Sequence, residues 1–127
     1  MQRFNKQFAT IYGLAVKLSA AADADALLVM LDGPTDWQAL KKGARKEKIV
    51  VAADLKEELE GAEDEGLATV VLGKEDAPVF EKLTQALLEA VADDILDPGA
   101  EVIAVYSGFE AGKIDSISYI RLDEHLG

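Results

Sequence analysis

The chain has 127 residues, of which 50% are hydrophobic and 29% are charged, a balance typical of one globular domain. Its formal net charge of −11 argues against binding of nucleic acid, which needs a basic surface, and against attachment to anionic membranes. The absence of cysteine excludes disulfides, thiol catalysis and cysteine-ligated zinc. The N-terminal residues lack the apolar core of a signal peptide, and no apolar run has the length of a membrane span, so we expect a cytoplasmic protein.

The first part of the chain predicts helices and buried strands in alternation. Apolar residues at three-to-four spacing predict an amphipathic helix over residues 4–22. The short apolar run Ala26–Leu31 ends at Asp-Gly-Pro, which favours a strand over a helix. Thr35, with a glutamine three residues further on, matches a capping box, so we expect it to cap a helix that ends near Ala44. Ile49–Ala52 is the second predicted strand.

The middle of the chain continues this alternation. We expect Asp54 to cap a short helix, after which an acidic connection leads to the third strand, Thr69–Leu72. A longer helix is predicted to begin near Pro78. Its expected buried stripe comprises Phe80, Leu83, Leu87, Ala90 and Val91.

The C-terminal stretch predicts two strands joined by a glycine-containing loop. Val102–Tyr106 is continuously apolar, as expected of a strand covered on both faces. Ile117–Leu122 alternates in polarity, which favours a partly exposed edge strand. The connection is too short for a crossover, so we expect this last strand to be antiparallel to its neighbour. Only one charge, Arg121, discourages pairing with another edge, so we also expect self-association as a homo-oligomer.

Strands that alternate with helices predict a three-layer α/β/α fold with a largely parallel sheet, and we treat residues 1–127 as a single domain. The order of features resembles the C-terminal regulatory domain of pyruvate kinase. The similarity is carried by Asp97-Pro98-Gly99 before an apolar strand, by Ser107-Gly108 after it and by a serine-containing edge strand, and it extends from about Phe8 to Leu122. It implies a five-stranded sheet of order 3-2-1-4-5 with an antiparallel last strand. It also implies a regulatory role, because the catalytic machinery of pyruvate kinase lies in another domain.

The implied strand order reverses between the first and fourth strands, where ligands of open α/β sheets bind beyond the carboxyl ends of the strands. The loops at that point are residues 32–36 and 107–112. In pyruvate kinases that are regulated by a phosphorylated sugar, a Ser/Thr-containing loop at the first position cradles phosphate and the second loop closes over it. The resemblance therefore implies a ligand site, and our candidate binding residues are Asp32, Gly33, Thr35, Ser107, Gly108 and Gly112.

This site departs from a phosphate-binding pattern. The Ser/Thr-rich run is reduced to Thr35, Pro34 lacks an N–H donor, and three carboxylates surround the proposed anion, those of Asp32, Asp36 and Glu110. We therefore expect a small neutral polar ligand, or a phosphorylated one bridged by a cation. The alternative is that Thr35 serves only as a helix cap.

A third hypothesis is an enzyme that uses Asp32, Thr35 and Ser107, but the sequence offers these residues no positioned base. A triad would have to bring the single histidine, His125, to Ser107, which no Gly-x-Ser-x-Gly motif surrounds. The aspartates of residues 93–97 lack the loop spacing of a calcium site. We expect no catalytic residues, no metal and no cofactor. Trp37 either stacks on a ligand or packs against a neighbouring helix or subunit.

The segment Asp32-Gly33-Pro34 is similar to the Asp-Gly-Ala motif of diadenylate cyclases, but the Arg-His-Arg motif that those enzymes also need is absent. Modules similar to this chain precede cyclase-type domains in some bacterial proteins, and that resemblance implies an accessory domain. The sequence thus predicts a non-catalytic domain that senses a small molecule. The alternative is a purely structural dimerisation module, or an accessory module of a larger nucleotide-cyclase-type protein.

Overall fold

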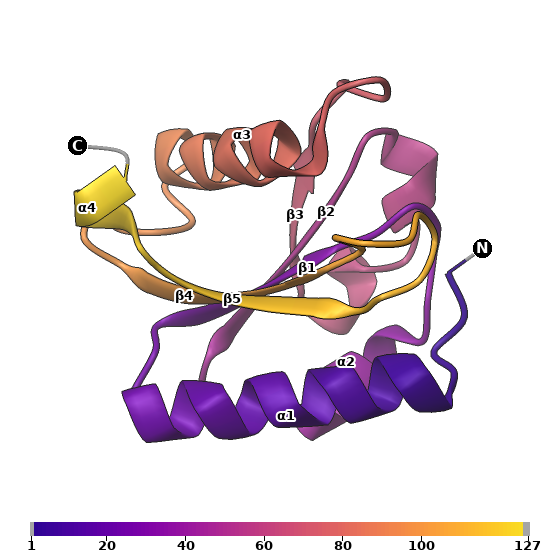
Figure 1. Ribbon diagram of the computed structural model, residues 1–127, viewed down its shortest axis with the longest axis horizontal. Helices are drawn as coiled ribbons and strands as arrows, with labels where there is room; N and C mark the ends of the chain where they lie inside the picture. Colours follow the sequence, from indigo (N-terminus) through magenta and orange to yellow (C-terminus); the bar gives the residue numbers. More distant parts are fainter. Residues whose placement is uncertain (1, 126–127) are drawn as a thin grey trace.

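The computed structural model describes residues 2–125, which form a five-stranded sheet between two layers of helices (Figure 1). Within these residues, no helix combines the length and the apolar character needed to cross a membrane. Short 3-10 turns, η1 and η2, connect β2 to β3. The elements in chain order are α1 (Lys6–Ala22), β1 (Ala26–Met30), α2 (Trp37–Gly43), β2 (Lys48–Ala53), η1 (Lys56–Leu59), η2 (Glu63–Glu65), β3 (Ala68–Val71), α3 (Val79–Ala92), β4 (Glu101–Tyr106), β5 (Ser116–Arg121) and α4 (Leu122–His125).

The sheet has the order β3-β2-β1-β4-β5, with β1 to β4 parallel and β5 antiparallel to β4. The predicted architecture and its antiparallel edge strand are confirmed. Val29 of β1 lies opposite Val51 of β2 and Val105 of β4, so these three strands end at nearly the same level. The loops that follow β1 and β4 therefore begin side by side at the carboxyl edge of the sheet.

Side chains alternate along the strands and supply two separate cores. Residues such as Leu27 pack beneath α1 and α2, whereas residues such as Leu28 pack against α3. Because both faces are covered, β1, β2 and β4 are apolar in sequence except at Lys48 and Glu101, the first residues of β2 and β4. Tyr12 fixes α1 to α2 by donating its hydroxyl to the carbonyl of Leu40 at 2.6 Å, and burial raises the pKa of this tyrosine well above its ordinary value.

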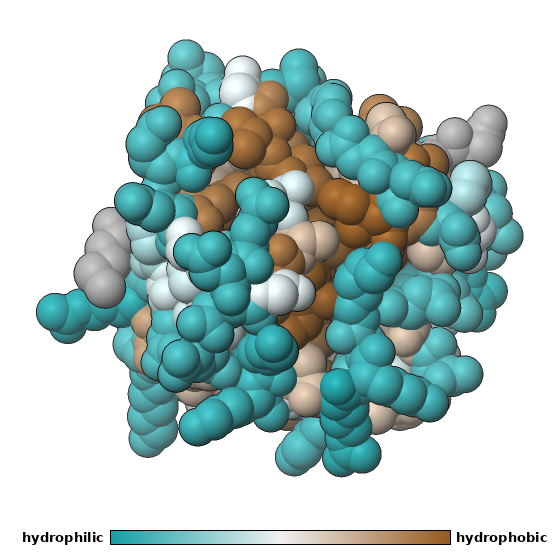
Figure 2. Space-filling model, turned by 180° about the vertical axis from the view of Figure 1, so that it is seen from behind, coloured by the Kyte–Doolittle hydropathy of each residue, from teal (hydrophilic) through white to brown (hydrophobic). Residues whose placement is uncertain are grey.

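The two edges of the sheet differ in what surrounds them. Strand β5 lies above α1 on the near side of Figure 1. Figure 2 shows the opposite side of the molecule, where an apolar band runs along the edge that carries β3, between hydrophilic side chains.

Two predicted helix caps are wrong. The cap of α2 is Asp36, not Thr35, because the carboxylate of Asp36 accepts the backbone N–H of Ala39 at 3.0 Å. The 3-10 turn η1 begins after Leu55, whose N–H donates to the side chain of Glu58, so Asp54 caps no helix.

The buried stripe of α3 differs from the prediction at Phe80, in its first turn, and at Val91, which is half-buried. The buried residues of α3 are Leu83, Ala86, Leu87 and Ala90. Phe80 is 65% exposed, and its ring makes a T-shaped contact with the ring of Tyr106, with 6.0 Å between ring centroids.

Candidate functional site

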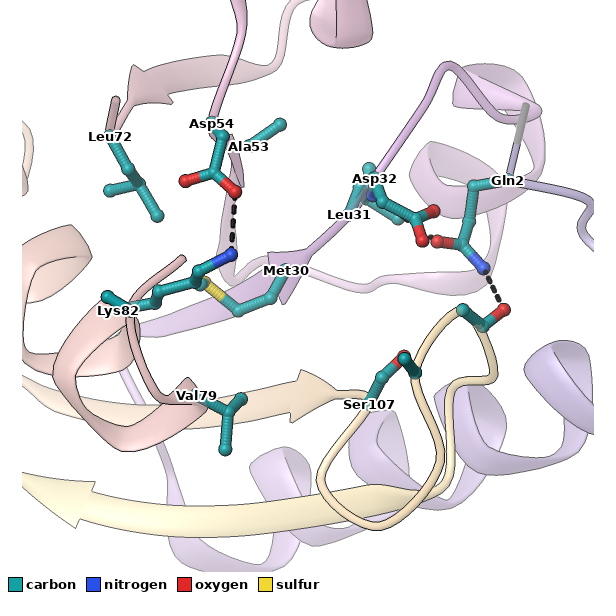
Figure 3. Close-up of a pocket in the computed structure, with 13 residues that line it drawn as sticks. Gln2, Met30, Leu31, Asp32, Ala53, Asp54, Leu72, Val79, Lys82 and Ser107 are labelled. Carbon is teal, nitrogen blue, oxygen red and sulfur yellow. Dashed lines mark hydrogen bonds and ion pairs between the residues drawn. The ribbon is translucent and has the colours of Figure 1, made fainter. Parts of the chain in front are cut away.

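A cleft of about 230 Å³ opens at the carboxyl edge of the sheet (Figure 3). It lies between the ends of β1 and β2, the start of α3 and the loop that joins β4 to β5. This is the point where the strand order reverses, the usual ligand position in open α/β sheets. The lining residues are Gln2, Met30, Leu31, Asp32, Ala53, Asp54, Leu72, Ala77, Val79, Lys82, Ser107, Ala111 and Gly112.

An ion pair between Lys82 and Asp54 forms one side of the cleft. The Nζ atom of Lys82 lies 2.6 Å from Oδ2 of Asp54, whose Oδ1 also accepts the backbone N–H of Lys74 at 3.1 Å. The two side chains are only 21% and 16% exposed, so solvent screens their attraction less than that of a surface pair. The cleft therefore offers two opposite charges at a fixed position.

Gln2 forms the other side of the cleft. Its Oε1 accepts the N–H of Asp32 at 3.3 Å, and its Nε2 donates to the carbonyl of Gly112 at 3.1 Å. Its backbone N–H donates to the carbonyl of Pro34 at 3.0 Å. One buried side chain thus connects the loop after β1 to the loop after β4, as Figure 3 shows.

The loop between β4 and β5 is fixed by Asp115. Its carboxylate accepts the Ser116 hydroxyl at 2.7 Å and the backbone N–H groups of Glu110 at 2.9 Å, Gly108 at 2.8 Å and Phe109 at 3.2 Å. The bond from Ser116 and those from the three N–H groups favour the ionised form and lower the pKa of Asp115 to about 2. This side chain therefore shapes one wall of the cleft.

The low pKa of Asp115 predicts a loss of stability in acid. As the pH falls below about 4, the unfolded chain takes up a proton that the folded chain still excludes, so stability is lost progressively between pH of about 4 and pH of about 2. We expect Asp115→Asn to reduce the free energy of unfolding by about 1 kcal/mol at pH 7 and to flatten this acid dependence. Urea denaturation of both proteins across this pH range measures the difference. Identical slopes for the two proteins would contradict it.

Only part of the predicted site lies at the cleft. The candidates that line it are Asp32, Ser107 and Gly112. The candidates outside its lining are Gly33, Thr35 and Gly108.

Thr35 and Gly108 have other surroundings. Thr35 is buried at a separate hollow beside Arg3 and Asn5, and its hydroxyl has no hydrogen-bond partner among residues 2–125. Gly108 lies close to the start of β5. A Cβ atom at this position would be 2.5 Å from Oγ of Ser116. The absence of a side chain at Gly108 therefore allows the hydroxyl of Ser116 to lie close to the backbone of the loop.

The lining of the cleft combines polar and apolar side chains. Two carboxylates, Asp32 and Asp54, and one ammonium group, Lys82, give its lining a net charge of −1. Within residues 2–125, no three histidine or acidic side chains are grouped so that they could hold a metal ion. The lining therefore suits a molecule that is neutral or carries a positive group.

The fold is the one found in the C-terminal region of pyruvate kinase. A pyruvate kinase from Cryptosporidium parvum in complex with ADP is similar, with a TM-score of 0.73 and 18% identity over 93% of this chain and 24% of that one. A second structure of a pyruvate kinase from the same organism gives a TM-score of 0.70 and 16% identity over 93% of this chain and 23% of that one. This chain thus spans about a quarter of those enzymes, and the likeness establishes the fold. No curated protein sequence matches the chain.

The sequence itself shows the family. The family described as "Probable sensor domain DacZ_P" matches residues 7–127, nearly the whole chain. The chain therefore belongs to this family of probable sensor domains. The resemblance to pyruvate kinase is confirmed at the level of the fold, and the family assignment agrees with the second resemblance, to accessory modules of diadenylate-cyclase-type proteins.

Proposed function

We propose that this chain is a non-catalytic sensing domain that binds a small polar molecule in the cleft beside Asp32, Lys82 and Ser107. The observation that carries the proposal is a preformed cleft with a partly buried ion pair at the point where the strand order reverses. Membership of a family of probable sensor domains supports it. We also propose that the chain is cytoplasmic, as the sequence predicts.

The lining indicates the chemical class of the ligand. The apolar side chains of Met30, Leu72 and Val79 offer a wall for a hydrocarbon part. Ser107 and the amide of Gln2 offer hydrogen bonds to hydroxyl or amide groups. Because the charged groups sum to −1, a neutral or cationic molecule fits better than a bare phosphate, and a phosphorylated ligand would need a bridging cation.

The antiparallel hairpin supports a non-catalytic role. Ser107 follows the end of β4, whereas His125 follows the end of β5, so the two residues lie at opposite ends of the hairpin (Figure 1). A serine–histidine pair at the cleft is therefore incompatible with this topology. The cleft offers positions for binding, and the histidine is exposed at the other end of the sheet.

The family name and the resemblance to modules that precede cyclase-type domains support an accessory role. In that role, occupation of the cleft would change the activity of a diadenylate-cyclase-type domain in the same protein. Such coupling requires that the ligand bind two states of the protein with different affinities.

We expect a ligand of the cleft to raise the melting temperature, since it binds only the folded chain. The screen comprises nucleotides, sugar phosphates with and without Mg²⁺, amino acids and polyols. For a hit that is neutral or phosphorylated, and so offers Lys82 an acceptor, we expect Lys82→Met to weaken the affinity about tenfold or more, the loss typical of a charged hydrogen bond. Calorimetry of the wild type, Lys82→Met and the matched surface variant Lys42→Met measures this.

The controls separate binding from stability. Lys82→Met leaves Asp54 without its partner, so the double variant Asp54→Asn, Lys82→Met tests whether a lower affinity reflects a damaged fold. Unchanged affinity in both Lys82 variants would place the ligand elsewhere. Failure of all compound classes to shift the melting temperature would argue against sensing at this cleft.

A further inference from the structure

Among residues 2–125, no strand pairs with the outer edge of β5, and exposed apolar side chains lie beside it. On β5 itself, Tyr119 is 42% exposed and Ile117 is half-buried. On α1, Leu14 is 49% exposed and Leu18 is 37% exposed. Large apolar side chains at this level of exposure, gathered next to a free edge, mark a surface that a partner can cover.

Leu14 and Leu18 belong to a stripe of side chains on the flank of α1 that faces β5. Gln7, Ile11, Leu14 and Leu18 recur at intervals of four, three and four residues, which places them on one flank of the helix. Gln7 donates its amide to the carbonyl of Ile114, just before β5, at 2.9 Å. The stripe and the edge strand therefore form one surface, which we call the α1–β5 face.

The backbone of β5 presents free hydrogen-bonding groups at this face. The N–H of Leu122 donates to the carbonyl of Ala100 at 3.0 Å. Ala100 is the residue that lies directly opposite Leu122 when the register of β4 and β5 is continued by one residue. Successive residues of an antiparallel strand point their backbone groups to alternate sides. The backbone groups of Ile117, Tyr119 and Arg121 are thus directed away from β4, toward the open edge.

The distribution of charge indicates what can cover the face. The chain contains 24 acidic residues, yet none occurs in residues 1–22 or in β5. Two copies with a net charge of −11 repel each other over most of their surfaces. At the α1–β5 face, the carboxylate of Glu101 accepts the hydroxyl of Tyr119 and lies 3.5 Å from Arg121, which offsets its charge. The repulsion between two copies is therefore weaker at this face, so a second copy can approach there.

The opposite edge of the sheet differs in this respect. The apolar band along β3 in Figure 2 borders a hollow at Val71, and the charged residues that line it, Lys56, Glu60, Glu63 and Asp64, are acidic in balance. A two-fold contact at this edge would bring the carboxylates of two copies together, which disfavours self-association.

We propose that a second copy of this chain binds the α1–β5 face, with the two β5 strands paired antiparallel about a two-fold axis. Such a contact is self-complementary, because each copy offers the same free edge and the same apolar stripe. It would extend the sheet across both copies and bury Leu14 and Leu18 of each. This inference does not depend on the ligand of the cleft.

The experiment compares the masses of four proteins by sedimentation at micromolar concentrations, in physiological and in molar salt. They are the wild type, the double variant Leu14→Glu, Leu18→Glu, the edge variant Tyr119→Pro and the control Val71→Glu. Val71 is 46% exposed on the other edge strand and so matches Leu14 in exposure. We expect dimers for the wild type and Val71→Glu. We expect monomers for Leu14→Glu, Leu18→Glu, whose glutamates suit an exposed helix, and for Tyr119→Pro, which lacks an edge donor.

Far-UV circular dichroism checks that each variant remains folded, and hydrogen exchange of the wild type provides a second readout. In the dimer, the amides of Ile117, Tyr119 and Arg121 should exchange slowly, and dilution to monomer should speed their exchange. A wild type that remains monomeric in both salts would overturn the proposal. So would a dimer that survives Leu14→Glu, Leu18→Glu or one that Val71→Glu abolishes.

Discussion

Replacement of Trp37 with alanine should lower the free energy of unfolding by about 3–5 kcal/mol, the range for removing a buried aromatic side chain. Trp37 is only 8% exposed and belongs to the core beneath α1 and α2. Its Nε1 donates to the carbonyl of Glu60 at 2.9 Å and so holds the turns between β2 and β3 against α2. The ring of Trp37 therefore packs within the domain, as one of the two predicted roles requires; the other was stacking on a ligand.

The conservative variant Trp37→Phe separates the two contributions. It keeps most of the buried ring and loses the hydrogen bond to Glu60, so we expect a loss of about 1 kcal/mol. Urea denaturation followed by far-UV circular dichroism measures both variants, because neither retains the tryptophan fluorescence. A small effect of Trp37→Ala on stability, together with lost binding of a cleft ligand, would instead indicate that the ring stacks on that ligand.

A second large effect is expected at Gly108. A Cβ atom there would lie 2.5 Å from Oγ of Ser116 and 2.9 Å from the ring of Tyr106. Ser116 cannot turn away freely, because its hydroxyl donates to Asp115. We expect Gly108→Val to cost about 3 kcal/mol, the upper part of the usual range for overpacking.

Gly99 provides the matched control, because a Cβ atom there meets nothing within 4 Å. Gly99→Val should change the free energy of unfolding by less than about 0.5 kcal/mol, as surface substitutions usually do. Thermal and urea denaturation of the two valine variants compare the sites directly. Equal stability of Gly108→Val and Gly99→Val would show that the loop yields easily at Gly108.

Much of the fold is predictable because burial on both faces of a parallel sheet leaves a strong pattern. The apolar runs around Leu28, Val50 and Ala104 predict β1, β2 and β4 to within a residue or two at each end. The strand order came from the resemblance to pyruvate kinase, since spacing alone does not distinguish the possible orders. The start of α2 does not follow from the sequence, because Thr35 and Asp36 are adjacent and both are good caps.

The cleft was only partly predictable. The rule that ligands bind beyond the carboxyl ends of strands led to Asp32 and Ser107. The same rule applied to β2 would have suggested Asp54, which the sequence pattern assigned to a helix cap instead. In the sequence, Lys82 resembles any solvated lysine of an amphipathic helix. Its ion pair with Asp54 forms only because α3 packs close to the end of β2, and the sequence does not show that packing. Gln2 precedes the first helix, in a segment without periodicity, so its bridge between two loops follows only from the tertiary structure.

The location of ligand binding tests the central claim most directly. The measurement is the change in amide chemical shifts of the isotopically labelled domain when a compound that raises its melting temperature is added. The proposal predicts that the largest changes fall on the residues around the cleft, including Asp32, Asp54, Lys82, Ser107 and Gly112. Changes confined to the β3 edge around Glu63, or to the α1–β5 face, would contradict it.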